Sequence, residues 1–333
     1  MKRTIIKDVN IVNEGEKYIG TVVVCNDTIE EVFRQGEEYS LSNFADADVI
    51  DGKGLFLIPG VIDDHVHFRE PGLTHKANIR SESMAAVSGG ITTIMDMPNT
   101  TPQTTTVANL NDKFEIMSRS CLANYSCYFG ATNSNYGMLK DLDKKTVCGV
   151  KIYMGSSTGD MLVDRRLSLQ NIFGGTDLII AAHCEDQTTI SNNTARYKEM
   201  YGDNVDVKYH PKIRSAEACY LSSKFAIELA NEANARLHIM HISTAKELSL
   251  FSSGQIDGKR ITAEACTPHI WFDDSAYQTL GGRVKCNPAV KTAEDKEAIR
   301  RAINSDVIDI IATDHAPHLL SEKQGGALKA ASG

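Results

Sequence analysis

The chain has 333 residues, of which 42% are hydrophobic and 23% charged, and its formal net charge is -8, an ordinary composition for a globular protein. The acidic balance argues against a nucleic-acid binder, because such proteins neutralise phosphates with a basic face. No stretch approaches the roughly 20 apolar residues of a membrane span. The polar residues Lys7, Asp8 and Asn10 also interrupt the first apolar run too early for a signal peptide. Together with eight scattered cysteines, which indicate reduced thiols, these features predict a cytoplasmic protein.

The first 55 residues predict a small β-domain. Short strand-like runs cover 4–12, 20–26 and 29–33, and Asn, Glu and Gly residues typical of turns separate them. From residue 56 onward the pattern changes, because short apolar runs now alternate with longer segments of helical period. We therefore expect a domain boundary near residue 55, with 1–55 and 56–333 as separate units.

The second part, 56–333, predicts an α/β fold of the (β/α)₈ barrel type. Eight apolar runs alternate with helical segments, at 55–68, 90–99, 126–132, 148–155, 177–186, 235–243, 259–269 and 306–317. One of these helical segments, 215–234, begins with Ser215, a good N-cap residue. Buried parallel strands read as continuous apolar runs, and barrel enzymes build their sites at the C-terminal strand ends. Residues 318–333 are too few for a full closing helix, so we expect the chain to be truncated there.

Metal-ligand residue types stand at the ends of several of these runs. His65 and His67 are two residues apart on one strand and so point to the same face. Four further residues stand at later strand ends: Lys151, His183, His241 and Asp314. Each has an ordinary alternative, such as a lysine that reaches solvent, a core histidine or an aspartate that caps a turn. As a set they provide four imidazoles and a carboxylate, which suit zinc and suffice for two ions if one more anion bridges them.

Lys151 could provide that bridging anion only after a chemical change. A protonated ammonium has no lone pair for a metal and would repel it. Capture of CO₂ by the neutral amine gives a carbamate, whose two oxygens could each bind one ion. Two ions held in this way could activate a bridging hydroxide and polarise a carbonyl, as in metal-assisted hydrolysis.

The set "HVH", "VKIYM", "HCED", "HIST" and "TDHAP" resembles the amidohydrolase superfamily, in the order that the superfamily has them. This resemblance implies a metal-dependent hydrolase of cyclic amides. It also implies that the N-terminal strands form half of a small β-sandwich, which a C-terminal segment missing from this sequence normally completes. Some relatives are non-enzymatic scaffolds, but those have generally lost metal ligands, whereas this chain retains every position.

Within that superfamily, "HFREPG" and "MPNT" most resemble the long, bacterial-type dihydroorotases. The resemblance implies that Arg69, Asn99 and His318 hold the substrate carboxylate and that Asn287 approaches the substrate ring. The segment around Asn287 departs from the family pattern, with alanine and lysine where the family has proline and arginine. Allantoinases typically carry asparagine in place of Arg69, and dihydropyrimidinases and hydantoinases usually lack both the arginine and "EPG", yet both classes remain alternatives.

These substrate-binding residues also have ordinary interpretations. Arg69 could form a surface salt bridge with Glu70 or Glu82, Asn99 could be a turn residue, and His318 could lie in an exposed loop. Rates on dihydroorotate, allantoin and dihydrouracil would separate the activities.

The expected reaction is the reversible cyclisation of N-carbamoyl-L-aspartate to L-dihydroorotate in pyrimidine biosynthesis. A metal-bridged hydroxide would attack the ring carbonyl, and Asp314 would shuttle the proton. Some long-type dihydroorotases use an aspartate from the loop after strand four as the bridge, so Asp160 is the alternative to a carboxylated Lys151. We expect a small-molecule substrate, no nucleic acid, no membrane, and a second copy of the chain as the candidate protein partner.

Overall fold

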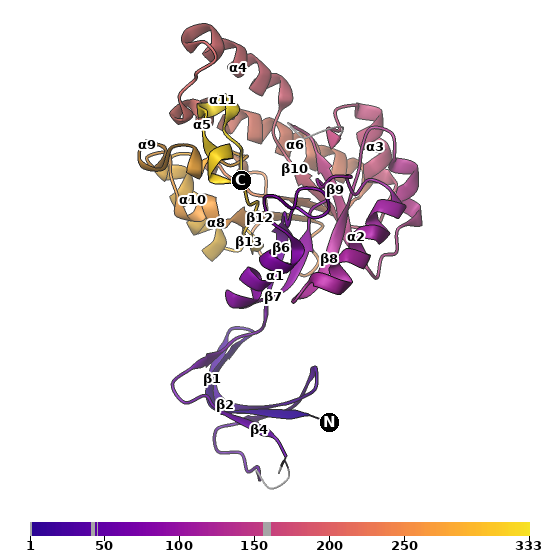
Figure 1. The fold of residues 1–333 in the computed structure, drawn as a ribbon, viewed down its shortest axis with the longest axis vertical. Coiled ribbons are helices and arrows are strands. Elements are labelled where there is room, and N and C mark those ends of the chain that lie inside the picture. The colour runs from indigo at the N-terminus through magenta and orange to yellow at the C-terminus, as the bar shows by residue number, and fades with distance from the viewer. Residues whose placement is uncertain (1, 41–43, 45, 156–160) are drawn as a thin grey trace. The chain divides into compact units, whose positions relative to one another are not determined.

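The computed structural model describes residues 2–40, 44, 46–155 and 161–333, and the alternative bridging residue Asp160 lies outside them. The chain forms two compact units, 1–61 and 62–333 (Figure 1). Among the described residues no helix combines the length and hydropathy needed to cross a bilayer. All eight cysteines are free thiols.

The first unit is a mixed sheet with the strand order β3-β2-β1-β4, in which β5 also pairs with β1. Its strands are β1 (Arg3–Asn13), β2 (Glu16–Cys25), β3 (Thr28–Arg34), β4 (Asp48–Asp51) and β5 (Phe56–Leu57). A two-residue turn joins β1 to β2, and both of its residues, Glu14 and Gly15, have positive φ, as the favoured hairpin turn requires. Val9, Ile11 and Val22 form the small core of this unit.

The second unit contains eight parallel strands in sequential order from β6 to β13, which confirms the predicted barrel (Figure 1). The strands are β6 (Val61–Val66), β7 (Ile91–Asp96), β8 (Asn124–Gly130), β9 (Val147–Tyr153), β10 (Ile180–His183), β11 (Leu237–Ile239), β12 (Ile261–Cys266) and β13 (Ile310–Ala312). The first and last strands meet, because Asp63 accepts hydrogen bonds from the backbone and hydroxyl of Thr313. The His67 amide also donates to the His315 carbonyl, at 2.8 Å.

Helices and 3₁₀ turns lie between these strands and after the last of them. They are α1 (Ile79–Ser88), α2 (Val107–Ser120), η2 (Tyr136–Asp141), α3 (Arg166–Gly174), α4 (Gln187–Tyr201), η4 (Val207–Tyr209), α5 (His210–Ile213), α6 (Ala216–Ala233), α7 (Ala245–Leu248), α8 (Thr267–Trp271), α9 (Ala276–Leu280), η5 (Gly281–Val284), α10 (Ala293–Asn304), η6 (Leu320–Lys323) and α11 (Gly326–Lys329). The predicted N-cap is confirmed, because the Ser215 hydroxyl accepts from the Ala218 amide at the start of α6.

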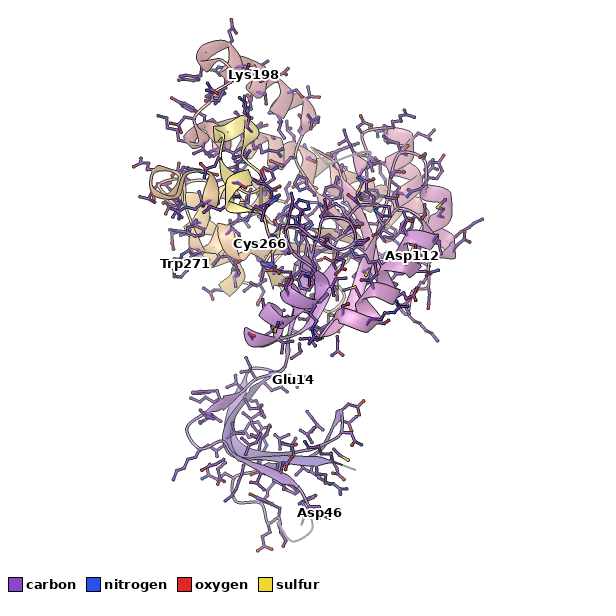
Figure 2. All side chains as sticks on the ribbon, viewed as in Figure 1. Glu14, Asp46, Asp112, Lys198, Cys266 and Trp271 are labelled. Atoms are coloured by element: carbon purple, nitrogen blue, oxygen red, sulfur yellow. The ribbon has the colours of Figure 1, made fainter. Side chains whose placement is uncertain are left out.

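The central strands of the barrel, β9, β10 and β11, are buried on both faces, as their continuous apolar sequences require. In β9, for example, Val150 and Ile152 have no exposed surface. Burial ends soon after β12, where Figure 2 labels two residues. Cys266, the last residue of β12, is fully buried, whereas Trp271, at the end of the following helix, is 71% exposed. Polar side chains inside this apolar barrel must therefore find partners among themselves.

Candidate active site

All the residues predicted as metal ligands or substrate contacts line one cavity of about 820 Å³. The cavity lies at the C-terminal ends of the barrel strands, because His65 stands near the end of β6, His183 ends β10, and Asp314 follows β13. The predicted residues among its lining are His65, His67, Arg69, Asn99, Lys151, His183, His241, Asn287, Asp314 and His318. The barrel thus brings residues that are far apart in the sequence together in the lining of one cavity.

His65 in β6 and His67, one residue beyond that strand, face the carboxylate of Asp314. His65 Nε2 and His67 Nε2 each lie 3.1 Å from Asp314 Oδ1. Their other nitrogens are occupied, because His65 Nδ1 lies 2.9 Å from Glu264 Oε1 and His67 Nδ1 lies 2.7 Å from Asn99 Oδ1. Since carboxylate oxygens only accept, Glu264 fixes the proton of His65 on Nδ1 whenever that ring is neutral. Both Nε2 atoms then converge on one point, together with a carboxylate oxygen, which is a geometry that suits a cation.

A second pair of imidazoles lies beside the first, with the centre of the His241 ring 5.3 Å from that of His65. His183 Nδ1 is 2.9 Å from His241 Nε2, and His183 Nε2 is 2.9 Å from Glu185 Oε2. Arg214 in turn contacts the buried Glu185 carboxylate. Burial lowers the pKa of His183, and burial together with the neighbouring imidazole lowers the pKa of His241 well below its ordinary value. The two imidazoles are therefore neutral, and a nitrogen of one ring contacts a nitrogen of the other. The Nδ1 atom of His241 is buried and has no hydrogen-bond partner among the described residues.

Lys151 lies in β9 with no exposed surface. Its Nζ is 2.7 Å from Met240 Sδ and 4.9 Å from the centre of the Tyr153 ring, and among the described residues it forms no ion pair. Burial lowers its pKa to about 8. A buried ammonium without a carboxylate partner is costly, and burial therefore favours the neutral amine.

The predicted substrate contacts form the outer part of the cavity wall. Arg69 is only 7% exposed and donates from Nε to the Pro317 carbonyl at 3.0 Å, and its Nη2 lies 3.0 Å from His318 Nε2. It does not pair with the two glutamates named as alternatives. Glu70 accepts instead from the Ile79 amide.

The two asparagines that line the cavity use their side-chain oxygens in hydrogen bonds with histidines. Asn99 uses Oδ1 to accept from His67, and Asn287 uses Oδ1 to accept from His210 Nε2 at 3.1 Å. The amide of each side chain therefore retains its NH₂ donor for another partner. An anion in this cavity would meet a guanidinium and neutral donors, which match a planar carboxylate.

Sequence reasoning missed the acidic residues that support the histidines. Glu264 has no exposed surface and accepts from both His65 Nδ1 and the His241 backbone amide, the latter at 2.7 Å. Burial opposes its ionisation, but His65 and His238 hold the pKa of Glu264 well below its ordinary value. Glu185 supports His183 in the same way. The sequence could have indicated Glu264, because this glutamate lies inside an otherwise apolar strand and a buried carboxylate needs a partner.

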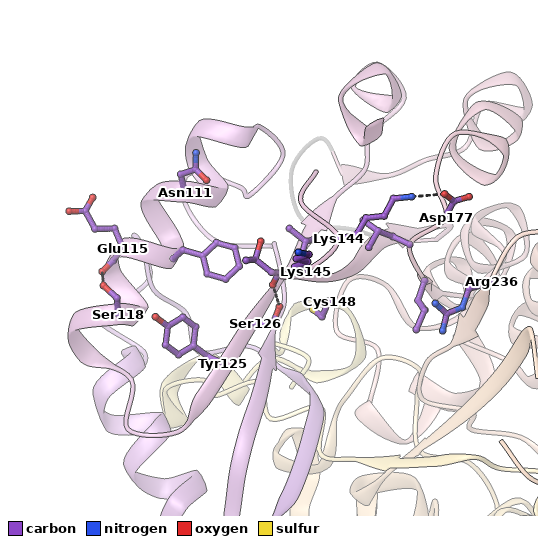
Figure 3. Close-up of a pocket in the computed structure, with 15 residues that line it drawn as sticks. Asn111, Glu115, Ser118, Tyr125, Ser126, Lys144, Lys145, Cys148, Asp177 and Arg236 are labelled. Carbon is purple, nitrogen blue, oxygen red and sulfur yellow. Dashed lines mark hydrogen bonds and ion pairs between the residues drawn. The ribbon is translucent and has the colours of Figure 1, made fainter. Parts of the chain in front are cut away.

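A second cavity, of about 1010 Å³, lies at the opposite ends of the strands (Figure 3). Tyr125 and Ser126 line it near the start of β8, and Arg236 lines it just before β11. Figure 3 shows Lys144 paired there with Asp177. None of the predicted site residues lines this cavity, so its larger volume does not make it the better candidate.

Comparison with known proteins agrees with this geometry. A family model described as dihydro-orotase-like matches residues 54–247. The chain is 33% identical over 286 residues to the dihydroorotase of Carboxydothermus hydrogenoformans, covering 84% of this chain and 64% of that protein. It is 30% identical to the dihydroorotase of Methanosarcina mazei, covering 98% of this chain and 72% of the relative. The chain thus spans about two thirds of the length of the curated relatives that it matches.

Solved structures show the same fold. The L-hydantoinase of Arthrobacter aurescens superposes with a TM-score of 0.91 at 24% identity, over 99% of this chain and 73% of that one. The dihydropyrimidinase of Brevibacillus agri gives a TM-score of 0.86 at 21% identity, with the same coverage of both chains. At these identities the likeness supports the fold alone.

Proposed function

The chain belongs to the dihydro-orotase-like family, and from that premise we propose that it catalyses the reversible cyclisation of N-carbamoyl-L-aspartate to L-dihydroorotate in pyrimidine biosynthesis. The observation that carries this proposal is the cavity in which a metal-type donor set lies beside Arg69. Curated relatives named dihydroorotase support the same assignment.

We propose that His65, His67 and Asp314 hold one divalent cation and that His183 and His241 hold a second, with zinc as the native metal. The donor set supports this, because imidazole nitrogens and carboxylate oxygens are the ligands that zinc takes. His183 Nδ1 and His241 Nε2 lie 2.9 Å apart, so a cation bound between them could replace their mutual hydrogen bond. When bound, two such cations polarise a carbonyl and lower the pKa of a water molecule.

We propose that Lys151 is carboxylated and bridges the two cations. Its complete burial without an ion pair among the described residues supports a modified side chain over a bare ammonium. Asp160 remains the alternative bridge. Lys151→Ala should lose at least one metal and most activity, whereas retention of two metals by Lys151→Ala together with their loss in Asp160→Ala would assign the bridge to Asp160.

The remaining residues orient the substrate and move its proton. Arg69, with the neutral donors Asn99 and His318, is proposed to hold the substrate carboxylate, while Asn287 approaches the ring. In the hydrolytic direction Asp314 takes a proton from the attacking water and returns it to the departing ring nitrogen. Cyclisation uses the same groups in reverse. The negative net charge of the chain does not oppose an anionic substrate, because the local field is set by Arg69 and the cations.

The decisive experiment compares dihydroorotate, which carries a carboxylate, with two cyclic amides that lack one. The protein, purified without chelator, is assayed for metal content and for turnover of dihydroorotate, allantoin and dihydrouracil. We expect about two metal ions per chain and a clear preference for dihydroorotate. Arg69→Met should keep its metal and lose ~2 to 4 kcal/mol of transition-state stabilisation on dihydroorotate.

Three results would count against this assignment. Normal dihydroorotate turnover by Arg69→Met would refute the role of Arg69 in carboxylate binding. A preference for allantoin or dihydrouracil would identify an allantoinase or a dihydropyrimidinase instead, and a chain without metal and without activity would be a scaffold.

We also propose a cytoplasmic location, supported by eight free cysteines. A homodimer is the proposed assembly, and the mass of the native protein by light scattering would test it.

A further inference from the structure

We propose that Lys113 and Asp96 are positioning residues for recognition of the substrate carboxylate. Their buried ion pair ties together the ends of β6 and β7. Arg69 follows the end of β6 and Asn99 follows the end of β7, and both residues line the cavity. This inference rests on the function proposed above and adds two residues that lie outside the cavity.

The ion pair lies entirely inside the protein. Lys113 is on α2 and Asp96 ends β7, and neither side chain has any exposed surface. Lys113 Nζ lies 2.7 Å from Asp96 Oδ2. Asp112, the preceding residue of the helix, is exposed, and Figure 2 labels it at the surface. Two charges withdrawn from water are costly unless further hydrogen bonds satisfy them, so the other contacts of this pair indicate what it does.

Those other contacts are all with the backbone at the two strand ends. Asp96 Oδ1 accepts from the Phe68 amide at 2.8 Å, and Lys113 Nζ donates to the Met97 carbonyl at 2.6 Å. The Met97 amide itself donates to the Val66 carbonyl at 2.9 Å. The ion pair thus fixes the residue just before Arg69 and, immediately after β7, the residue two positions before Asn99.

Arg69 needs such support because its backbone is in an unfavourable conformation. Its φ is 68°, in the left-handed region that residues with a Cβ rarely adopt. A conformation of this kind persists only where surrounding contacts determine it. The Phe68 amide bond to Asp96 holds the chain before Arg69, and the Leu73 amide holds it afterwards by donating to the Arg69 carbonyl at 3.0 Å. Loss of the ion pair should therefore displace the guanidinium from its position.

The metal ligand on the same segment has independent anchors. The His67 amide donates to the His315 carbonyl at 2.8 Å, and His67 Nε2 faces Asp314. Weakening the ion pair should consequently affect recognition of the carboxylate more than metal binding. In kinetic terms, the KM for dihydroorotate should rise more than kcat falls.

Lys113→Met tests this inference, with Lys259→Met as a matched control. Lys259 Nζ lies 2.7 Å from Asp309 Oδ1, and Asp309 Oδ2 accepts from the Ala263 amide at 2.9 Å, so the chemistry is the same. That pair lies at the starts of β12 and β13, away from the cavity. The measurements are KM and kcat for dihydroorotate, metal content, and amide hydrogen exchange of the peptide covering 66–69.

We expect Lys113→Met to raise KM about tenfold with a smaller change in kcat, to retain its metal, and to exchange faster at 66–69. Lys259→Met should leave KM and the exchange of this peptide unchanged. If Lys113→Met does not fold, Lys113→Met/Asp96→Asn leaves no unpaired buried charge and carries the same test.

An unchanged KM, unchanged exchange at 66–69, or an equal KM rise in Lys259→Met would each overturn the inference. If the unaltered protein does not turn over dihydroorotate, the proposed function fails. The exchange comparison between the two lysine variants then still decides whether the ion pair holds this segment.

Discussion

Glu264→Gln should weaken metal binding although Glu264 is not itself among the proposed ligands. The carboxylate accepts from His65 Nδ1 at 2.9 Å and from the His241 amide at 2.7 Å, so it supports one histidine of each proposed metal site. Glutamine keeps the size and one acceptor oxygen but removes the charge. A hydrogen bond to a charged group contributes ~1.5 to 3 kcal/mol and a neutral one ~0.5 to 1.5, so each contact should lose about 1 kcal/mol. Each site should therefore lose about 1 kcal/mol, or about fivefold in its affinity for zinc, and the product of the two affinities should fall about 30-fold.

The measurement is a competitive zinc titration of the metal-free protein against a chromophoric chelator. Glu247→Gln is the matched control, because Glu247 is also buried but accepts from the hydroxyls of Ser223 and Thr244, at 2.8 and 2.9 Å. It should bind zinc as the unaltered protein does. An affinity within about twofold for Glu264→Gln, or an equal loss in Glu247→Gln, would refute the reasoning about histidine orientation.

Three further changes test the site and the fold. Asp314→Asn should keep the fold and some metal but lose turnover in both directions, because an amide cannot carry the proton; near-normal turnover would move that role to His318. Gly72→Ala should lower the free energy of unfolding in denaturant by ~2 kcal/mol or more, because φ is +83° and the new Cβ would overlap the Thr101 carbonyl oxygen; a change under ~0.5 kcal/mol would contradict this. Burial lowers the pKa of His210 to about 3, so its neutral form stabilises the fold fully above pH 6.5, and this contribution is lost as the pH falls toward 3. His210→Gln should therefore flatten the pH dependence of unfolding by ~1.4 kcal/mol per pH unit in that window, and parallel curves for the two proteins would contradict the assignment.

Local patterns in the sequence were enough to predict the barrel. Buried strands read as apolar runs, and each predicted run overlaps one strand of the observed barrel. The start of α6 followed from Ser215, because capping depends on residues within one turn. The shared direction of His65 and His67 followed from the two-residue period of a strand. The convergence of strand ends is a general property of barrels, so the sequence also predicted which residues would share a cavity.

Contacts between distant residues were decided only by the tertiary structure. Glu264 lies 199 residues from His65, and nothing in the local sequence of either residue indicates the other. Lys113 has the sequence environment of an ordinary surface lysine in a helix, yet packing of α2 against the barrel buries it beside Asp96. These pairings depend on the order and closure of the strands, which determine which buried charges meet. Periodicity and capping are set within a few residues of chain, whereas the partner of a buried charge is set by the packing of the whole barrel.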